Sequence, residues 1–209
     1  MQSWFNIYLK RTILLIASLS LAITAITQGT ILPYRRSSPP IRHYSNFGSA
    51  LDYLERGNFY AEQGEHKKAI ANYNQAIEMT PHYADAYFNR GNSYAQQQKY
   101  DLAIADYERA IEIDPDDSNA YYNRGCYYFQ RKEYDLAIAD FNRTIKLDSH
   151  DADAYFERGN TYAKLGKYNL AKTDREKAKR LFIDQENTVK VKEIERILKT
   201  LASPQKDPR

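Results

Sequence analysis

Residues able to do covalent or metal chemistry are few and scattered in this chain. Its 209 residues include one cysteine, Cys126, so it can form neither an internal disulfide nor a CxxC metal site. The four histidines fall in separate stretches: His43, His66, His82 and His150. The sequence contains no glycine-rich phosphate loop and no nucleophile elbow. It therefore predicts a protein that is not an enzyme, with no catalytic residue, no metal site and no cofactor.

A different regularity organises the chain, because the same residue types return every 34 positions. Each repeat contains a glycine, with a tyrosine four residues before it and another three residues after it. The glycines are Gly57, Gly91, Gly125 and Gly159. An alanine follows each glycine after twelve residues. Self-similarity at a period of this length predicts a repeat solenoid.

The spacing inside each repeat predicts two packed helices. The two tyrosines and the glycine lie along one helical face, where the glycine removes side-chain bulk. A second helix carries the alanine and, in the first three repeats, an aromatic residue four positions later, so it can approach closely. The predicted units are 50–83, 84–117, 118–151 and 152–185.

The turns inside the units are predicted to need a left-handed residue. Gly64 and Gly166 suit such a C-terminal cap, because glycine adopts positive φ without steric cost. Gln98 and Lys132 occupy the equivalent places in the second and third units. We therefore expect slight backbone strain at these two residues.

This pattern resembles the tetratricopeptide repeat family. The resemblance implies an all-α, right-handed α-solenoid whose first helices line a concave groove for an extended peptide or a partner helix. It places an apolar row three residues before the glycines and an amide row just after them. The apolar row is Leu54, Phe88, Tyr122 and Phe156, and the amide row is Asn58, Asn92 and Asn160, with Cys126 in the third unit. An alternative, in which these side chains only fill helix surface, stays open.

Some members of this family hold a C-terminal carboxylate with Lys, Asn and Arg side chains. The matching places here are Leu54, Asn58, Asn89, Asn119 and Asn123. Asn58 and Asn89 match that pattern, but the three cations are missing, so a terminal carboxylate would lose its hydration with little compensation. Asn89 and Asn123 join the predicted groove residues, and we expect the groove to prefer neutral or basic peptide segments.

An arginine stands immediately before each repeat glycine: Arg56, Arg90, Arg124 and Arg158. Aspartates recur on three of the second helices at Asp106, Asp140 and Asp174. We expect these residues to form a ladder of ion pairs between paired helices. A basic stripe that binds ligand carboxylates is the alternative.

The N-terminal segment 1–32 contains an uncharged run of 21 residues, 12–32, which follows Lys10 and Arg11. At ~1.5 Å per residue a helix over this run spans about 30 Å, enough to cross a bilayer. The run predicts an uncleaved membrane anchor. Cleavage as a signal peptide, with export, is the main alternative, and a buried helix is a third. Arginines after the run balance the basic residues before it, so the side of the membrane on which the repeats lie stays open.

The remaining segments flank the repeats. Residues 33–49 are rich in Pro, Ser and Arg and predict an extended linker. Apolar residues at helical spacing within 186–202 predict a helix that caps the last repeat, and 203–209 form a tail.

Charge is distributed unevenly. Residues 1–48 carry five Lys/Arg and no acid, residues 49–163 carry twelve against twenty acids, and residues 164–209 carry thirteen against seven. An acidic repeat body argues against nucleic-acid binding, which needs cations along the contact surface. The basic C-terminal helix is expected to be a solvated face, with contact to anionic lipid or nucleic acid as the alternative.

We therefore expect a protein or peptide partner, held by a non-catalytic, membrane-tethered scaffold that assists complex assembly. The alternative is a structural module that self-associates through solenoid ends or the groove, which would make it a homo-oligomer.

Overall fold

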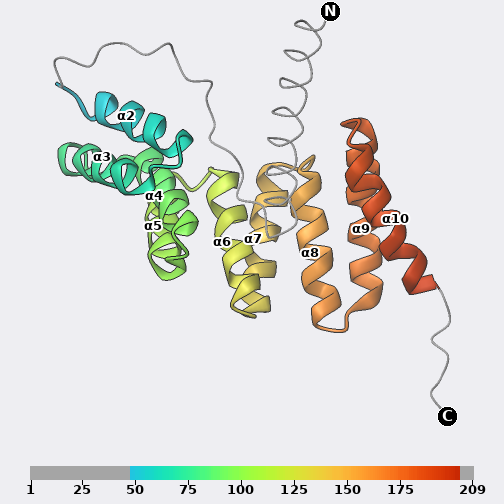
Figure 1. The fold of residues 1–209 in the computed structure, drawn as a ribbon. Helices are drawn as coiled ribbons and strands as arrows, with labels where there is room; N and C mark the ends of the chain where they lie inside the picture. The colour runs from blue at the N-terminus through green and yellow to red at the C-terminus, as the bar shows by residue number, and fades with distance from the viewer. Residues whose placement is uncertain (1–47, 203–209) are drawn as a thin grey trace, which may run out of the picture. The chain divides into compact units, whose positions relative to one another are not determined.

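A computed structural model describes residues 48–202, in which every regular element is an α-helix. All of these residues belong to one compact unit, Pro33–Arg209. The all-α class is therefore confirmed for the described part of the chain. Its helices, drawn in Figure 1, are α2 (Ala50–Glu62), α3 (His66–Met79), α4 (Ala84–Gln96), α5 (Tyr100–Ile113), α6 (Ser118–Gln130), α7 (Tyr134–Leu147), α8 (Ala152–Lys164), α9 (Tyr168–Asp184) and α10 (Thr188–Ala202).

The first helix starts where the sequence provides a cap. The Ser49 hydroxyl accepts a hydrogen bond from the backbone N–H of Asp52, whose carboxylate accepts one from the backbone N–H of Ser49. This reciprocal pair satisfies backbone donors that a helix N-terminus leaves without partners.

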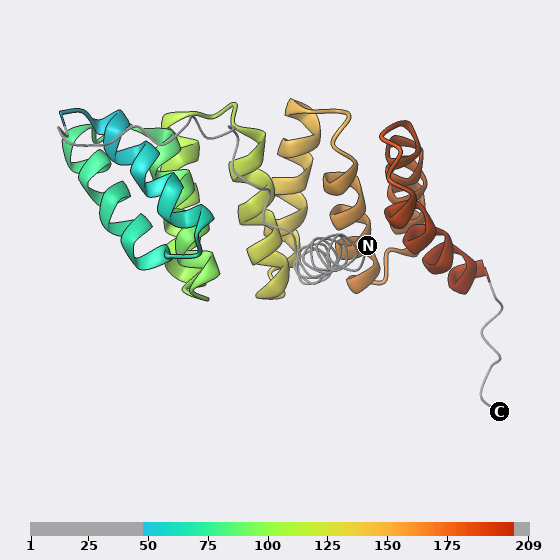
Figure 2. The ribbon, with the colours of Figure 1, turned by 45° about the horizontal axis from the view of Figure 1, so that its top comes forward.

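Each 34-residue unit contains one helix pair, and consecutive pairs stack in chain order (Figures 1 and 2). Within the units, the first helices α2, α4, α6 and α8 each pack on the helix that follows. The second helices α3, α5 and α7 also pack on the first helix of the next unit. The first helices α2 and α4 also contact each other, as do α6 and α8. Burial is thus continuous from one unit to the next.

Close approach at the repeat glycines is confirmed. A Cβ atom added to Gly91 would lie 2.9 Å from Cε1 of Tyr107 and 3.3 Å from the carbonyl oxygen of Ala103. Both partners lie on α5, and both are buried. The glycine therefore gives the second helix the space in which its aromatic ring packs.

The turns inside the units have the predicted left-handed residues. Gly64 and Gly166 have φ of 74° and 73°, and Gln98 and Lys132 have φ of 60° and 64°. A side chain with a Cβ is disfavoured in this region, so the strain expected at Gln98 and Lys132 is present.

Helix α10 covers the end of the last repeat, as expected of a capping helix. Ile194 is fully buried, and Val191, Ile197 and Leu198 pack around it against Phe182 of α9. The apolar stripe predicted for this helix thus meets the last repeat.

Several predictions lie outside the described residues. They concern the hydrophobic run 12–32, most of the linker 33–49 and the tail 203–209. Between residues 48 and 202, no helix combines the length and the apolar character that a membrane crossing requires.

Candidate functional site

Four of the predicted groove amides lie in two hydrogen-bonded triads that join neighbouring units. Asn58 of α2 accepts two hydrogen bonds at its Oδ1: from the Tyr73 hydroxyl of α3 at 2.9 Å, and from Nδ2 of Asn89 on α4 at 3.1 Å. All three side chains are buried. One amide oxygen therefore connects both helices of the first unit to the first helix of the second unit.

The second unit repeats this arrangement. Oδ1 of Asn92 accepts hydrogen bonds from the Tyr107 hydroxyl at 2.8 Å and from Nδ2 of Asn123 at 2.9 Å. Burial raises the pKa of Tyr107 well above its usual range, so the hydroxyl stays a donor. Asn123 is fully buried, whereas Asn92 is half-buried. The Asn92 side chain is therefore partly accessible to solvent, whereas Asn58 and Asn89 are buried.

The apolar row lies in the core. Leu54, Phe88, Tyr122 and Phe156 are only 5%, 6%, 0% and 3% exposed. Each first helix packs on the units beside it, so these four side chains are part of the core. Their contact with a ligand stays a prediction.

The junction of the third and fourth units lacks the triad. Phe141 stands where Tyr73 and Tyr107 supply a hydroxyl, Cys126 replaces the acceptor asparagine, and Glu157 replaces the donor asparagine. In the fourth unit, Asn160 accepts a hydrogen bond from Nη2 of Arg175 at 3.0 Å and donates to the Glu157 carboxylate at 3.4 Å. The junction of the third and fourth units therefore has a carboxylate, Glu157, where the first two junctions have a hydrogen-bonded amide.

The predicted arginine ladder is confirmed. Arg90 donates from Nε and Nη2 to the two carboxylate oxygens of Asp106, at 2.8 and 2.7 Å. The same two-bond geometry joins Arg124 to Asp140 and Arg158 to Asp174. In the first unit Arg56 donates instead to the amide oxygen of Asn72.

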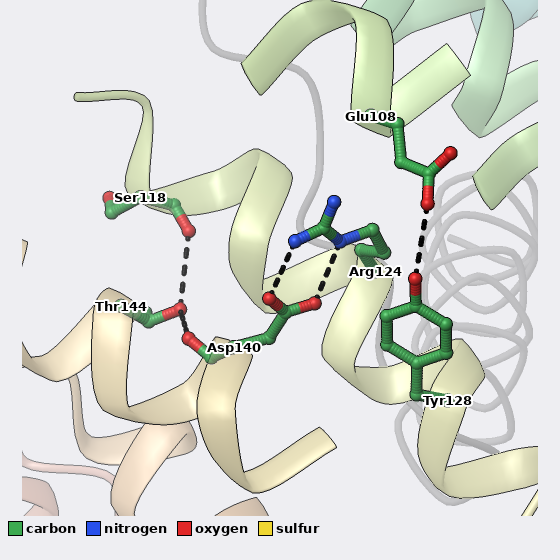
Figure 3. A network of polar contacts seen from close by, with 6 residues as sticks. All are labelled: Glu108, Ser118, Arg124, Tyr128, Asp140 and Thr144. Atoms are coloured by element: carbon green, nitrogen blue, oxygen red, sulfur yellow. Dashed lines mark hydrogen bonds and ion pairs between the residues drawn. The ribbon is translucent and has the colours of Figure 1, made fainter. Parts of the chain in front are cut away.

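Figure 3 shows this network around Arg124 and Asp140. The Asp140 carboxylate is 7% exposed and the Arg124 side chain is 17% exposed. Burial raises the pKa of the Asp140 carboxyl, and Arg124 acts in the opposite direction. Next to the pair, the Thr144 hydroxyl donates to the Asp140 carbonyl at 3.1 Å (Figure 3). Each arginine therefore forms hydrogen bonds with a carboxylate or an amide on the other helix of its own unit. This pairing disfavours the alternative in which the arginines form a basic stripe that binds ligand carboxylates.

The triads and the gathering of acidic residues on α8 were not predicted from the sequence, although two signals in the sequence indicate them. Tyrosine on the second helix coincides with asparagine on the first in units one and two, and both are lost together in unit three, at Phe141 and Cys126. Acidic residues also gather near the start of α8, at Asp151, Asp153 and Glu157. In residues 48–202, His, Cys, Asp and Glu form no group that could hold a metal ion.

Comparison with known families identifies the repeat. Models of the tetratricopeptide repeat match residues 84–117, 106–139 and 152–182, and a further TPR model matches residues 57–98 and 127–166. No curated protein matches the chain at a significant level.

Solved structures have the same fold. One is the first TPR domain of Spaghetti (RPAP3) bound to the HSP90 peptide SRMEEVD, with 26% identity, a TM-score of 0.55 and coverage of 56% of this chain and 94% of that chain. Another is MamA, with 23% identity, a TM-score of 0.60 and coverage of 72% of this chain and 88% of that chain. The likeness to MamA shows the fold alone.

Proposed function

Because the chain belongs to the tetratricopeptide repeat family, we propose that it is a non-catalytic scaffold, a right-handed solenoid, that binds an extended peptide segment on its first helices. The observation that supports this most directly is the similar RPAP3 domain, which was solved with a peptide bound. Peptide binding by such a surface needs no catalytic group, since backbone and side-chain contacts supply the affinity.

The charge on the first helices determines which peptides are expected to bind. Residues 49–163 carry twelve Lys/Arg against twenty Asp/Glu, and the ladder arginines are already paired with side chains of the chain itself. Uncommitted positive charge on the first helices is therefore scarce. We expect neutral or basic segments to bind better than acidic ones, with an affinity that falls as salt rises.

A pair of matched charge insertions tests this proposal. Asn119 is a half-buried amide on the first helix α6, and Gln75 is an exposed amide on the second helix α3. Peptides are selected from a random displayed library on the full-length chain, and their Kd is measured by fluorescence polarisation. We expect Asn119→Lys to weaken a basic peptide at least about threefold and Gln75→Lys to leave it unchanged. Equal effects, or no selected peptide at all, would contradict binding on the first helices.

The hydrophobic run 12–32 is proposed to tether this scaffold to a membrane. The support is its length and lack of charge. Full-length protein from membranes should then resist carbonate extraction and keep Met1. A soluble chain with a mature N-terminus near Gln28 or Thr30 would instead support export after cleavage.

Self-association is a second candidate function, which one surface favours. Between α9 and α10 lies a hollow of about 260 Å³ lined by residues that include Phe182 and Val191. Nearby Ile183 and Val189 are 52% and 69% exposed. The molar mass of the full-length chain in detergent, measured by light scattering, should exceed one chain if this end pairs, and Val189→Asp should then restore the monomer.

A further inference from the structure

A hollow of about 620 Å³ lies beside the turns of the first and second units. It is formed by the turn between α2 and α3, the first residues of α3, and the turn between α4 and α5. We call it the lysine hollow, and its lining includes Glu65, His66, Lys67, Lys68, Gln97 and Lys99. A hollow of this volume can hold a small ligand or one side group of a larger one.

Two side chains at the junction of the first and second units are smaller than their counterparts at the next junction. There the rings of Tyr100 and Tyr127 stack, with their centroids 5.2 Å apart. His66 and Ser93 occupy the equivalent places 34 residues earlier. Less ring volume therefore fills the first junction, which accounts for the hollow beside His66.

Polar atoms at this junction lack hydrogen-bond partners. Within residues 48–202, no hydrogen bond reaches the buried atoms Nδ1 of His66, Oγ of Ser93 and Nε2 of Gln97. Gln97 follows Ser93 by one helical turn, and Gln97 and His66 both line the lysine hollow. At the junction of the third and fourth units Thr161 takes the place of Ser93, and its hydroxyl donates to the Glu157 carbonyl at 2.8 Å. Because buried polar atoms are normally paired, the group at the first junction marks a place where a ligand can bind.

Positive charge is concentrated around these atoms. Three lysines line the hollow, and Glu65, which pairs with Lys68, is the acidic residue among them. Lys99 also lies over the Tyr94 ring, 5.9 Å from its centroid. Residues 49–163 as a whole have the opposite balance, with twelve Lys/Arg against twenty Asp/Glu. The lysine hollow is thus a local positive site on an acidic domain.

The groups that line the hollow are mainly hydrogen-bond donors. The lysine ammonium groups and Nε2 of Gln97 can only donate. Glu65, the N-cap of α3, forms no side-chain cap hydrogen bond, so the backbone N–H groups of that first turn have no side-chain acceptor. Burial lowers the pKa of His66, so its ring is neutral at pH 7 and donates from one nitrogen. A matching ligand must therefore accept hydrogen bonds and carry negative charge.

We propose that the lysine hollow binds an anionic group, either a phosphate or a carboxylate. Lys67, Lys68 and Lys99 supply the opposite charge, while Gln97 and His66 donate hydrogen bonds to its oxygens. An acidic or phosphorylated side chain of a protein partner and a free phosphate ion share this chemistry. The proposal goes beyond peptide binding on the first helices and does not depend on it.

Inorganic phosphate is the first probe. It is titrated into the full-length, isotope-labelled chain in detergent at pH 7, in exchange for chloride so that the ionic strength stays constant. We expect saturable NMR shifts of the Gly64 backbone amide and of the Gln97 side-chain amide, since both residues line the hollow. Bound phosphate should also raise the pKa of His66 to its ordinary value of 6.5 or above, because a nearby negative charge favours the imidazolium.

Protein variants locate the bound anion. Lys67→Gln and Lys99→Gln should each weaken phosphate binding at least about threefold. Lys132→Gln is the matched control and should leave the Kd unchanged, because Lys132 is an exposed turn lysine of the third unit and Gln98 holds the same place in the second. The double variant His66→Tyr, Ser93→Tyr copies the tyrosine pair of the next junction and should abolish saturable binding by filling the hollow. Thermal unfolding checks the fold of that variant, and the lysine variants test the proposal without it.

Two further probes distinguish the sources of the anion. Capped phosphoserine and capped aspartate are titrated beside inorganic phosphate. Tighter binding of a capped residue would assign the hollow to a side chain of a protein partner, and tighter binding of inorganic phosphate to a free anion. Shifts that do not saturate at constant ionic strength, or equal Kd values in Lys99→Gln and Lys132→Gln, would overturn the site. Either result leaves peptide binding intact, because that is tested separately at Asn119.

Discussion

Replacing Arg90 by leucine tests how much the arginine ladder stabilises the repeats. The Arg90 and Asp106 side chains are 18% and 8% exposed, and two hydrogen bonds join them. Arg90→Leu removes both bonds and leaves a largely buried carboxylate without its cation. Breaking a fully buried pair in this way costs about 3 to 5 kcal/mol, and partial exposure lowers that figure.

Protonation sets an upper limit on the loss. An Asp106 carboxyl left without a cation can take up a proton, and at pH 7 this costs about 4 kcal/mol from its ordinary pKa of 3.8. We therefore expect Arg90→Leu to lower the free energy of unfolding by about 2 to 4 kcal/mol at pH 7. Arg56→Leu is the matched control, because its partner Asn72 is neutral and its loss should be about 1 kcal/mol.

The pH dependence gives a second readout. In Arg90→Leu only burial acts on the Asp106 carboxyl, so its pKa in the folded state lies above the unfolded value. The ionised form is then penalised above that pKa, and the deficit shrinks as pH falls from 7 toward about 4. Urea unfolding of the full-length chain, with hydrogen exchange in α4 and α5, measures both effects. Equal losses in the two variants, or a deficit independent of pH, would refute the reasoning.

Three further predictions concern the triads, the glycines and the cap of α8. Asn92→Ala removes the acceptor of the Tyr107 hydroxyl and should lower the free energy of unfolding by about 1 to 3 kcal/mol in a urea titration; unchanged stability would show that the triad is dispensable. Gly91→Ala should cost about 1 to 3 kcal/mol by the same assay, because the added methyl meets the Tyr107 ring and the Ala103 carbonyl, and a neutral result would mean that α5 moves away freely. Burial raises the pKa of Asp151 to about 6, so Asp151→Asn, which keeps a capping oxygen, should add about 1 to 2 kcal/mol at pH 7. That gain should vanish below about pH 4 in thermal unfolding, because the native carboxyl is then protonated; a gain that persists there would exclude the buried charge as its cause.

Local and periodic features of this protein were determined by its sequence. The glycine spacing predicted helix pairs because a missing side chain and a facing ring are complementary wherever two helices meet, as at Gly91 and Tyr107. Gln98 and Lys132 were predicted to be strained because a helix C-terminus imposes its backbone geometry locally. The Arg–Asp pairs followed from charges that recur at one spacing on facing helices.

Tertiary structure alone decided which sides of the first helices stay open to a partner. The apolar row was predicted to line the groove; stacking buries its members Phe88 and Tyr122 between neighbouring units, and their contact with a ligand stays a prediction. The triads join Asn58 to Asn89 across 31 positions of the chain, a distance over which no local pattern specifies contact. The contact between Lys190 and Phe156 likewise depends on α10, because it forms only when the capping helix packs on the last repeat. The burial of each side chain and its hydrogen-bond partners are decided when the units stack on one another. The sequence period predicts that stacking only in outline.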